Sequence, residues 1–242
     1  MREVAEAIKN ADSVIALTGA GISTESGIPD FRSKGGLWSR YEIEEYGYIH
    51  NLLENPGRVW KMFADMIKNF EKAKPNSAHY ALAEMEKMGV LEAVITQNVD
   101  SLHQEAGSRN VVELHGNMRE LYCMACGRRY GYKDIDLAIL PPECICGGVI
   151  RPNVILFGEE PPRDALTKAH FYASKSDAII VAGTSCAVYP VAEIPLIVKR
   201  NGGKIIEINR DETEITPLAD YVVRGRLGEV MPELVEEIRN LL

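Results

Sequence analysis

The chain has 242 residues, of which 46% are hydrophobic, and its formal net charge is −8. This length and apolar content suit a large α/β domain with a smaller domain beside it. The acidic balance, without a basic stripe to neutralise phosphates, excludes broad nucleic-acid binding and favours attraction of basic protein segments.

The N-terminal stretch, MREVAEAIKNAD, has the pattern of an amphipathic helix with acidic residues and differs from a signal peptide. No apolar run approaches the roughly 20 residues that span a bilayer. We therefore expect a cytoplasmic protein that has no membrane partner.

A buried parallel strand is predicted at 14–18, and the glycine-rich stretch GAGISTESGIPDFRS follows it. This strand and turn are typical of a nucleotide-binding unit. The dehydrogenase fingerprint would place a third small residue at position 24 and then a helix, whereas the sequence has Thr24 and Pro29. We expect the backbone to approach a pyrophosphate at Gly19, Ala20 and Gly21, and then to leave as a loop that could cover a ligand.

Strands and helices alternate along the remaining chain. Further strands are predicted at 93–96, 111–114, 178–183, 204–208 and 221–223. Helices are predicted at 57–73, 77–88, 162–173, 191–200 and 228–241. Continuous Val/Ile runs in such an alternation indicate a Rossmann-like parallel sheet with helices on both faces.

Two segments interrupt this alternation and are assigned to a smaller domain. One is a helical insertion at 32–75, and the other is a cysteine-bearing module at 118–152. The Rossmann-like domain then comprises 1–31, 76–117 and 153–242.

Four of the five cysteines lie close together, at Cys123, Cys126, Cys144 and Cys146. Four thiolates close a tetrahedral zinc site, and in a module too small for its own core the metal supplies folding energy. The second pair is separated by one residue where the usual knuckle has two, and the glycines at 147 and 148 would ease that geometry. Unliganded or redox-active thiols are the alternative. Cys186 is expected to be a packed residue without a role.

Polar residues follow three of the predicted strands, where ligands bind in open parallel sheets. After the strand at 93–96 come Gln97, Asn98 and Asp100, and after the one at 178–183 come Thr184 and Ser185. His115 follows the strand at 111–114, and its ordinary pKa near 6.5 suits it to accept a proton at neutral pH. Each cluster taken alone also fits ordinary turn or helix-cap chemistry.

The motifs GAGISTESGIPDFRS, TQNVDSLHQEAG, ELHGN, RPNVILFGE and GTSCAVYPVA, together with the four cysteines, resemble the sirtuin NAD-dependent protein deacylases over nearly the whole chain. The resemblance implies that NAD is consumed as a co-substrate and that acetyl, or another uncharged acyl group, is removed from lysine. The products would be nicotinamide, 2′-O-acyl-ADP-ribose and free lysine. It also implies one structural zinc, which is non-catalytic because four protein ligands leave no open position.

The resemblance assigns roles residue by residue. His115 matches the general base of the family. Asn98 is assigned to the catalytic residues together with it. The nicotinamide pocket matches Ala20, Ile28, Asn98, Val99 and Asp100. Gln97 and Asn98 match the residues that orient the nicotinamide ribose. Phe31 and Arg32 match the loop that closes over it. Contacts to the phosphates and adenosine match Gly19, Gly21, Gly183, Thr184, Ser185 and Asn209.

An extended acyl-lysine peptide is expected to enter between two segments, with Val154 and Phe157 on one side and Val188 on the other. Backbone pairing there would give weak sequence selectivity. Relatives that remove succinyl or malonyl groups carry a tyrosine and an arginine where this chain has Phe63 and Met66. The pocket is therefore expected to prefer uncharged acyl groups, unless these two residues serve only the core.

The partners implied are acyl-lysine proteins, such as basic chromatin or metabolic proteins. Proteins of two other functional classes could have the same sequence features. A mono-ADP-ribosyltransferase would use the same NAD pocket, and a zinc-ribbon binding module would have a degenerate nucleotide fold. The ELHG segment with His115 favours deacylation over both.

Overall fold

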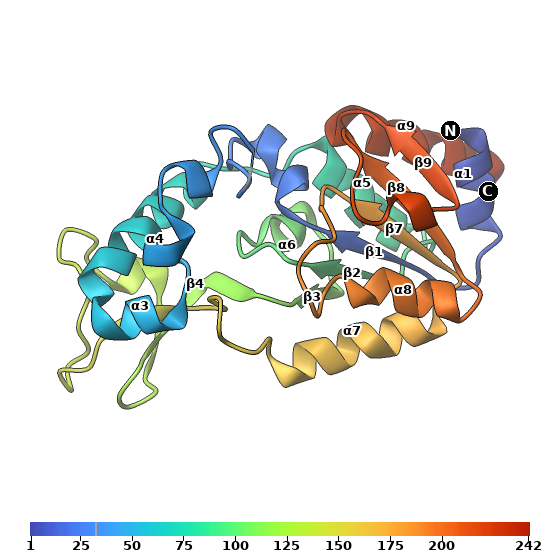
Figure 1. Cartoon of the computed structure of the whole chain (residues 1–242). Coiled ribbons are helices and arrows are strands. Elements are labelled where there is room, and N and C mark those ends of the chain that lie inside the picture. Colours follow the sequence, from blue (N-terminus) through green and yellow to red (C-terminus); the bar gives the residue numbers. More distant parts are fainter. Residues whose placement is uncertain (32) are drawn as a thin grey trace.

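The computed structural model describes residues 1–31 and 33–242 and divides into two bodies (Figure 1). The larger body contains a six-stranded parallel sheet in the order β3-β2-β1-β7-β8-β9. The strands are β1 (Val14–Thr18), β2 (Ala93–Thr96), β3 (Val111–Glu113), β7 (Ala178–Ala182), β8 (Lys204–Asn209) and β9 (Tyr221–Arg224). This order reverses between β1 and β7, which is the Rossmann arrangement and places a ligand crevice at that point.

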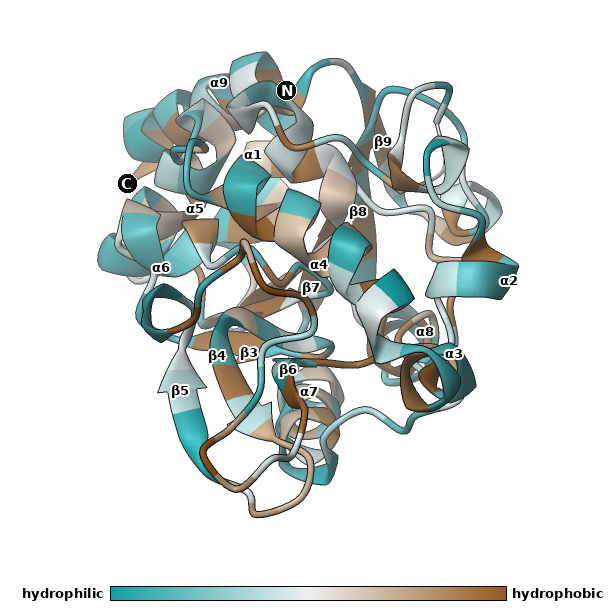
Figure 2. Ribbon diagram, turned by 90° about the vertical axis from the view of Figure 1, so that its left-hand side faces the viewer, coloured by the Kyte–Doolittle hydropathy of each residue, from teal (hydrophilic) through white to brown (hydrophobic). Residues whose placement is uncertain are grey.

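Helices cover both faces of this sheet. One face packs against α1 (Arg2–Lys9), α5 (Ser77–Lys87) and α9 (Leu227–Leu241), and the other packs against α7 (Arg163–Lys175) and α8 (Glu193–Arg200). Burial on both sides explains why β1 and β7 are apolar without alternation. In Figure 2 the interior strand β8 is largely hydrophobic, whereas α9 turns hydrophilic residues outward. The expected Rossmann-like fold is thus confirmed.

The smaller body combines short helices with a three-stranded antiparallel sheet in the order β5-β4-β6. Its helices are α2 (Ile43–Tyr46), α3 (Ile49–Glu54) and α4 (Pro56–Phe70), and its strands are β4 (Gly116–Cys123), β5 (Arg129–Gly131) and β6 (Ile150–Val154). These strands were not predicted. β4 and β6, which pair with each other, come from opposite ends of the cysteine segment. The residue pattern within a short stretch therefore gave little indication of these strands.

One hydrophobic cluster joins the helical insertion to this sheet. It includes Trp60 and Phe63 of α4 with Leu121 of β4 and Ile150 of β6. The Trp60 indole Nε1 donates to the Ile150 carbonyl over 2.8 Å. The two interrupting segments therefore pack as one unit although residues 76–117 of the larger body lie between them.

The turn after β1 differs from the expected loop. A 3₁₀ helix spans Ala20–Ser26 and ends at Gly27, whose φ is 84°. Glycine adopts this left-handed conformation without strain, so the helix stops there, two residues before Pro29. The remaining short elements are 3₁₀ turns at Leu37–Ser39, Tyr132–Asp134 and Thr216–Leu218, and the helix α6 (Leu102–Ala106).

The predicted element boundaries agree closely with the structure. The strand expected at 93–96 matches β2, and the helix expected at 57–73 ends three residues earlier, at Phe70. Within the described part of the chain, no helix has the length and apolar character needed to cross a membrane.

Candidate active site

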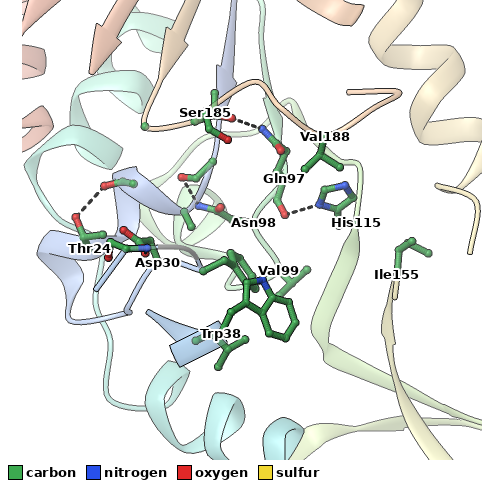
Figure 3. Close-up of a pocket in the computed structure, with 18 of the residues that line it drawn as sticks. Thr24, Asp30, Trp38, Gln97, Asn98, Val99, His115, Ile155, Ser185 and Val188 are labelled. Atoms are coloured by element: carbon green, nitrogen blue, oxygen red, sulfur yellow. Dashed lines mark hydrogen bonds between the residues drawn. The ribbon is translucent and has the colours of Figure 1, made fainter. Parts of the chain in front are cut away.

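A cleft of about 920 Å³ lies where the carboxyl ends of β1, β2, β7 and β8 meet the smaller body. Segments that follow these strands form one wall. The other wall is formed by α4 and by the chain after β6. Figure 3 shows Gln97, Asn98 and His115 directed into the same part of this cleft. Parallel strands bring such tips together from distant parts of the sequence, as the strand pattern predicted.

Two glycines of the first turn allow it to pack against the turn after β7. The Gly21 N–H donates to the Gly183 carbonyl over 2.8 Å. A Cβ on Gly21 would lie 2.7 Å from that oxygen, and one on Gly19 would lie 2.8 Å from the Thr184 Cβ. These distances are too short for any side chain. The glycines thus bring the two turns that line the cleft into contact.

His115 lies between β3 and β4, partly buried at the edge of the cleft. Its Nδ1 lies 3.1 Å from the Gln97 carbonyl oxygen. A carbonyl only accepts, so Nδ1 carries the proton and Nε2 of the neutral ring keeps a free lone pair. Burial lowers the pKa of His115, and the Gln97 carbonyl opposes that shift. The ring is therefore neutral at pH 7 and able to accept a proton through Nε2.

Asn98 belongs to a buried hydrogen-bond chain beneath the first turn. Its Nδ2 donates to the Gly19 carbonyl over 3.2 Å and to the Ser23 Oγ over 3.1 Å. Ser23 in turn donates to Asp100 over 2.7 Å. Burial raises the pKa of Asp100, while hydrogen bonds from the Leu102 N–H and Ser23 oppose the rise. This chain holds the 3₁₀ helix against the tip of β2.

The opposite end of the cleft is ordered by Thr184 and Asn209. The Gln97 Nε2 donates to the Thr184 Oγ1 over 2.7 Å. Asn209 donates to the Thr184 carbonyl over 3.4 Å and to the Glu207 carboxylate over 3.2 Å. Glu207 also accepts hydrogen bonds from Thr213 and Thr216 and forms an ion pair with Arg224 over 3.0 Å.

Glu207 was not identified from the sequence. It is fully buried in β8, and this burial by itself raises the pKa of its carboxyl group. The hydrogen bonds that the carboxylate accepts have the larger effect, so the pKa is lowered overall. A carboxylate within the apolar run KIIEIN was the available signal, because a buried charge needs partners.

The structure brings most of the predicted ligand residues to this cleft. Those that line it are Gly19, Ala20, Gly21, Phe31, Phe63, Met66, Gln97, Asn98, Val99, His115, Val154, Phe157, Gly183, Thr184, Ser185, Val188 and Asn209. Ile28 and Asp100 instead line a small adjoining pocket of about 30 Å³, which shares Ala20 and Asn98 with the cleft. The prediction for Arg32 lies outside the described residues.

Other residues that line the cleft were missed. They include Thr24, Leu37, Trp38, Met62, Met118, Ile155, Leu156 and Glu159. Most are apolar and occur at spacings that equally fit a hydrophobic core. Only the packing of the two bodies shows that they face a cavity.

The wall from α4 is built by a well-capped helix. Asn55 accepts a hydrogen bond from the Arg58 N–H over 3.1 Å, and Pro56 occupies the first turn. Phe63 and Met66 lie one turn apart, are 1% and 9% exposed, and both line the cleft. Trp60 packs edge-on against Phe63 with ring centroids 5.6 Å apart.

The four clustered cysteines lie apart from the cleft, in the smaller body. All four sulfur atoms are within 4.8 Å of one another. The Cys123–Cys146 and Cys126–Cys144 sulfur pairs are 3.5 and 3.7 Å apart. Zinc–sulfur bonds of about 2.3 Å in a tetrahedron place sulfurs about 3.8 Å apart. The four thiolates therefore fit zinc.

The shortened second cysteine pair depends on the glycines after it. Gly147 has a φ of 82°. A Cβ on Gly148 would lie 2.7 Å from the Cys123 sulfur. The Tyr130 hydroxyl donates to the Cys144 sulfur over 3.0 Å and orients it. Two adjacent glycines thus let the Cys-x-Cys turn close on the first pair.

Comparison with known proteins gives a consistent result. The model of the Sir2 family matches residues 19–190. An NAD-dependent protein deacylase of Pyrococcus abyssi is 50% identical over 99% of this chain and 98% of its own length. An NAD-dependent protein deacetylase of Sulfolobus acidocaldarius is 47% identical over 99% of this chain and 96% of its own.

Solved structures of Sir2 proteins are also similar to this chain over nearly its whole length. A Sir2 homologue in complex with NAD has a TM-score of 0.93 and 48% identity over 100% of this chain and 94% of its own. A Sir2 complex with a deacetylated p53 peptide and 3′-O-acetyl ADP-ribose has a TM-score of 0.93 and 39% identity over 98% of both chains.

Proposed function

This chain belongs to the Sir2 family, and on that premise we propose how its own residues carry out the reaction. The protein is an NAD-dependent protein-lysine deacetylase. NAD is its co-substrate, and the products are nicotinamide, the acyl ester of ADP-ribose and free lysine. The observation that supports the residue assignment best is the placement of His115, with Nδ1 donating to Gln97 and Nε2 free at the cleft.

His115 acts as the general base. A neutral acyl-lysine amide is a weak nucleophile, so much of the rate comes from holding it in line with the ribose carbon of NAD. His115 Nε2 then accepts a proton from the ribose hydroxyls. A positioned base of this kind contributes typically about 10² to 10⁴ in rate.

The residues of the first turn and of the β2 tip bind the nicotinamide half. Asn98 is oriented by its bonds to Gly19 and Ser23, so its remaining polar atom is directed at a fixed position. Ala20, Ile28, Val99 and Asp100 complete the pocket. Phe31 closes over it.

The residues at the ends of β7 and β8 bind the adenosine half. Gly183 allows close approach, and Thr184, Ser185 and Asn209 supply polar groups. The Gln97–Thr184 bond connects both halves of the site. The cleft is polar along these strand ends and apolar along α4, which fits a dinucleotide on one wall and an acyl chain on the other.

The acyl group of the substrate contacts Phe63 and Met66, and its peptide lies between Val154, Phe157 and Val188. A carboxylate beside Phe63 and Met66 would be desolvated without a partner. Among the described residues that line the cleft, the basic ones are Arg210 and Arg226, and both come from the β8 and β9 side. The pocket therefore prefers uncharged acyl groups.

One structural zinc is held by Cys123, Cys126, Cys144 and Cys146 and supplies folding energy to the smaller body. We propose that the Rossmann-like domain comprises 1–31, 76–117 and 153–242. The smaller domain then comprises 32–75 and 118–152. The support for this division is the hydrophobic cluster shared by α4, β4 and β6.

The physiological substrates are proposed to be basic chromatin or metabolic proteins, because the net charge of −8 attracts basic segments. A cytoplasmic location is proposed because reduced thiols that bind zinc persist in a reducing compartment.

The test is nicotinamide release from NAD by the purified protein, with and without an acetyl-lysine peptide. Release that depends on the peptide, with matching loss of the acetyl group, is expected. Peptide-independent release, or transfer of ADP-ribose label to protein, would instead indicate an ADP-ribosyltransferase.

A further inference from the structure

A buried ion pair lies behind the segment that lines the substrate side of the cleft. Residues 154–159 begin at the last residue of β6, and all of them line the cleft. Arg151 lies in β6 itself and is not among the lining residues. Its side chain is 3% exposed and pairs with Glu159, which is 23% exposed.

The geometry of this pair is bidentate. Nη1 and Nη2 of Arg151 donate to the two carboxylate oxygens of Glu159, each over 2.8 Å. The Tyr122 ring lies beneath the guanidinium, 5.7 Å from its Cζ to the ring centroid. Two parallel charge-assisted bonds fix both the distance and the plane of the pair.

Both side chains also form hydrogen bonds with the backbone of residues that lie between them in the sequence. Arg151 Nη2 donates to the Val154 carbonyl over 2.6 Å. The Glu159 carboxylate accepts from the Leu156 N–H over 2.9 Å. The pair therefore closes residues 154–159 into a loop and binds it from inside at two backbone positions.

The same loop is attached to the base and to the helical insertion. The Ile155 N–H donates to the His115 carbonyl over 3.0 Å. The Phe157 N–H donates to the Gly47 carbonyl over 2.9 Å, and its carbonyl accepts from the Ile49 N–H over 3.0 Å. Any shift of the loop would move the peptide-facing wall relative to His115.

A stabilising role alone does not account for this arrangement. Taking two charges out of water offsets most of their attraction, so a buried ion pair is a weak source of stability compared with apolar packing. Its bidentate geometry instead specifies where the loop lies.

We infer that Arg151 and Glu159 are positioning residues for the acyl-lysine peptide, setting the place of the 154–158 wall without Arg151 touching the substrate. This inference rests on the proposed function. Arg151→Lys keeps the charge but loses the bidentate fork, and Glu159→Gln keeps an acceptor for Leu156 but loses the charge.

The experiment measures KM for an acetyl-lysine peptide, KM for NAD and kcat, together with direct binding of a fluorescent acetyl-lysine peptide. Both variants are expected to raise the peptide KM and Kd roughly tenfold while the KM for NAD changes less than about twofold. Glu193→Gln is the control, because it removes an exposed ion pair to Arg200 on α8. It should leave all four constants unchanged.

The Arg151→Lys variant separates positioning from direct contact, since Glu159 itself faces the cleft. An unchanged peptide Kd in Arg151→Lys would overturn the inference. Equal increases in both KM values, or a lower melting temperature with unchanged KM, would also overturn it and indicate a purely structural pair. A wild-type protein that neither binds nor deacetylates the peptide would refute the proposed function itself, whatever the variants do.

Discussion

At His115, one backbone hydrogen bond decides which ring nitrogen is available. The Gln97 carbonyl holds Nδ1–H, and burial keeps the ring neutral. The lowered pKa leaves a weaker base than an exposed histidine, but one that is deprotonated over the whole neutral range. Position and protonation state are thus set by the same few contacts.

Replacing His115 by Ala is expected to lower deacetylation by about 10² or more, because no group remains to accept the ribose proton. The fold and most of the NAD affinity should be retained, since the ring is bound to the chain by one hydrogen bond. Steady-state turnover and NAD titration measure both. Retention of more than about a tenth of wild-type turnover would contradict the assignment.

The pH profile gives a second measurement of the same residue. His115 must be neutral to act, so activity rises as pH increases through its pKa and is constant above it. Because that pKa is lowered from 6.5, the acidic limb of kcat/KM should lie below pH 6.5. A limb centred above pH 7 would mean that another group supplies the base.

At the scale of single elements, α4 is the helix to which we assign the proposed acyl preference. The Trp60–Ile150 hydrogen bond attaches this helix to β6 and fixes its rotation about its axis. Phe63 and Met66 therefore face the cleft together, as their spacing of three residues allows on a helix. This orientation is compatible with the proposed role in acyl specificity, and both residues are also buried in the core.

Acetyl-lysine is expected to be turned over at least about tenfold faster than succinyl-lysine on the same peptide, because the succinyl carboxylate would lose several kcal/mol of hydration. The double variant Phe63→Tyr, Met66→Arg should shift the preference toward succinyl. Succinyl turnover equal to acetyl turnover in the wild type would refute the assignment.

The cysteine module is an element whose folding we expect to require zinc. Its β4–β5–β6 sheet is short, and two of its four thiols, those of Cys126 and Cys146, are exposed. Zinc binding is worth about 10 to 16 kcal/mol in zinc-finger peptides and would provide the missing folding energy.

Metal analysis is expected to give one zinc per chain. Cys144→Ser should lose the zinc and lower the melting temperature, whereas Cys186→Ala, which lies outside the cluster, should keep the full zinc content. Well under one zinc per wild-type chain, or unchanged zinc in Cys144→Ser, would argue against the site.

At the scale of the whole molecule, two histidines are buried in the seam between β1, α5 and α6. Burial lowers the pKa of His79 to about 4 and that of His103 to about 3, and the His79 ring adds to the shift of His103. Thr18 donates its hydroxyl to Thr96, so it accepts from His103 Nε2, and His103 Nδ1 has no partner. Protonation there would place a charge in a buried site.

Acid should therefore destabilise the fold before most carboxylates titrate. Both pKa values are lowered on folding, so the contribution of the two histidines is complete above pH 6.5 and decreases as pH falls toward about 4. His103→Gln preserves a donor to Thr18 but does not titrate. The stability advantage of wild type over this variant should fall by about 1.4 kcal/mol per pH unit between pH 6.5 and 4.

Urea unfolding at several pH values measures this difference. His50→Gln, at an exposed histidine, is the control and should show no such trend. A constant difference between wild type and His103→Gln from pH 7 to 5 would show that His103 is not held neutral by burial.

The sequence by itself determined the parallel sheet, the strand tips that line the cleft and the cluster of four cysteines. These features are local: apolar runs such as Val14–Thr18 specify buried strands, glycines specify tight turns, and cysteine spacing specifies a tetrahedral site. His115 and Asn98 belong to this group because each lies within two residues of the end of a predicted strand, and parallel strands end at the same edge.

Only the tertiary structure decided what connects these parts. Asn98 meets Ser23 across 75 positions of sequence, and Gln97 meets Thr184 across 87. The Arg151–Glu159 pair is close in sequence, but its burial depends on the β4–β6 sheet, whose partners lie on either side of the cysteine module. Hydrogen-bond partners and burial are properties of the packed chain, and they have no periodic or compositional signal that a single sequence could display.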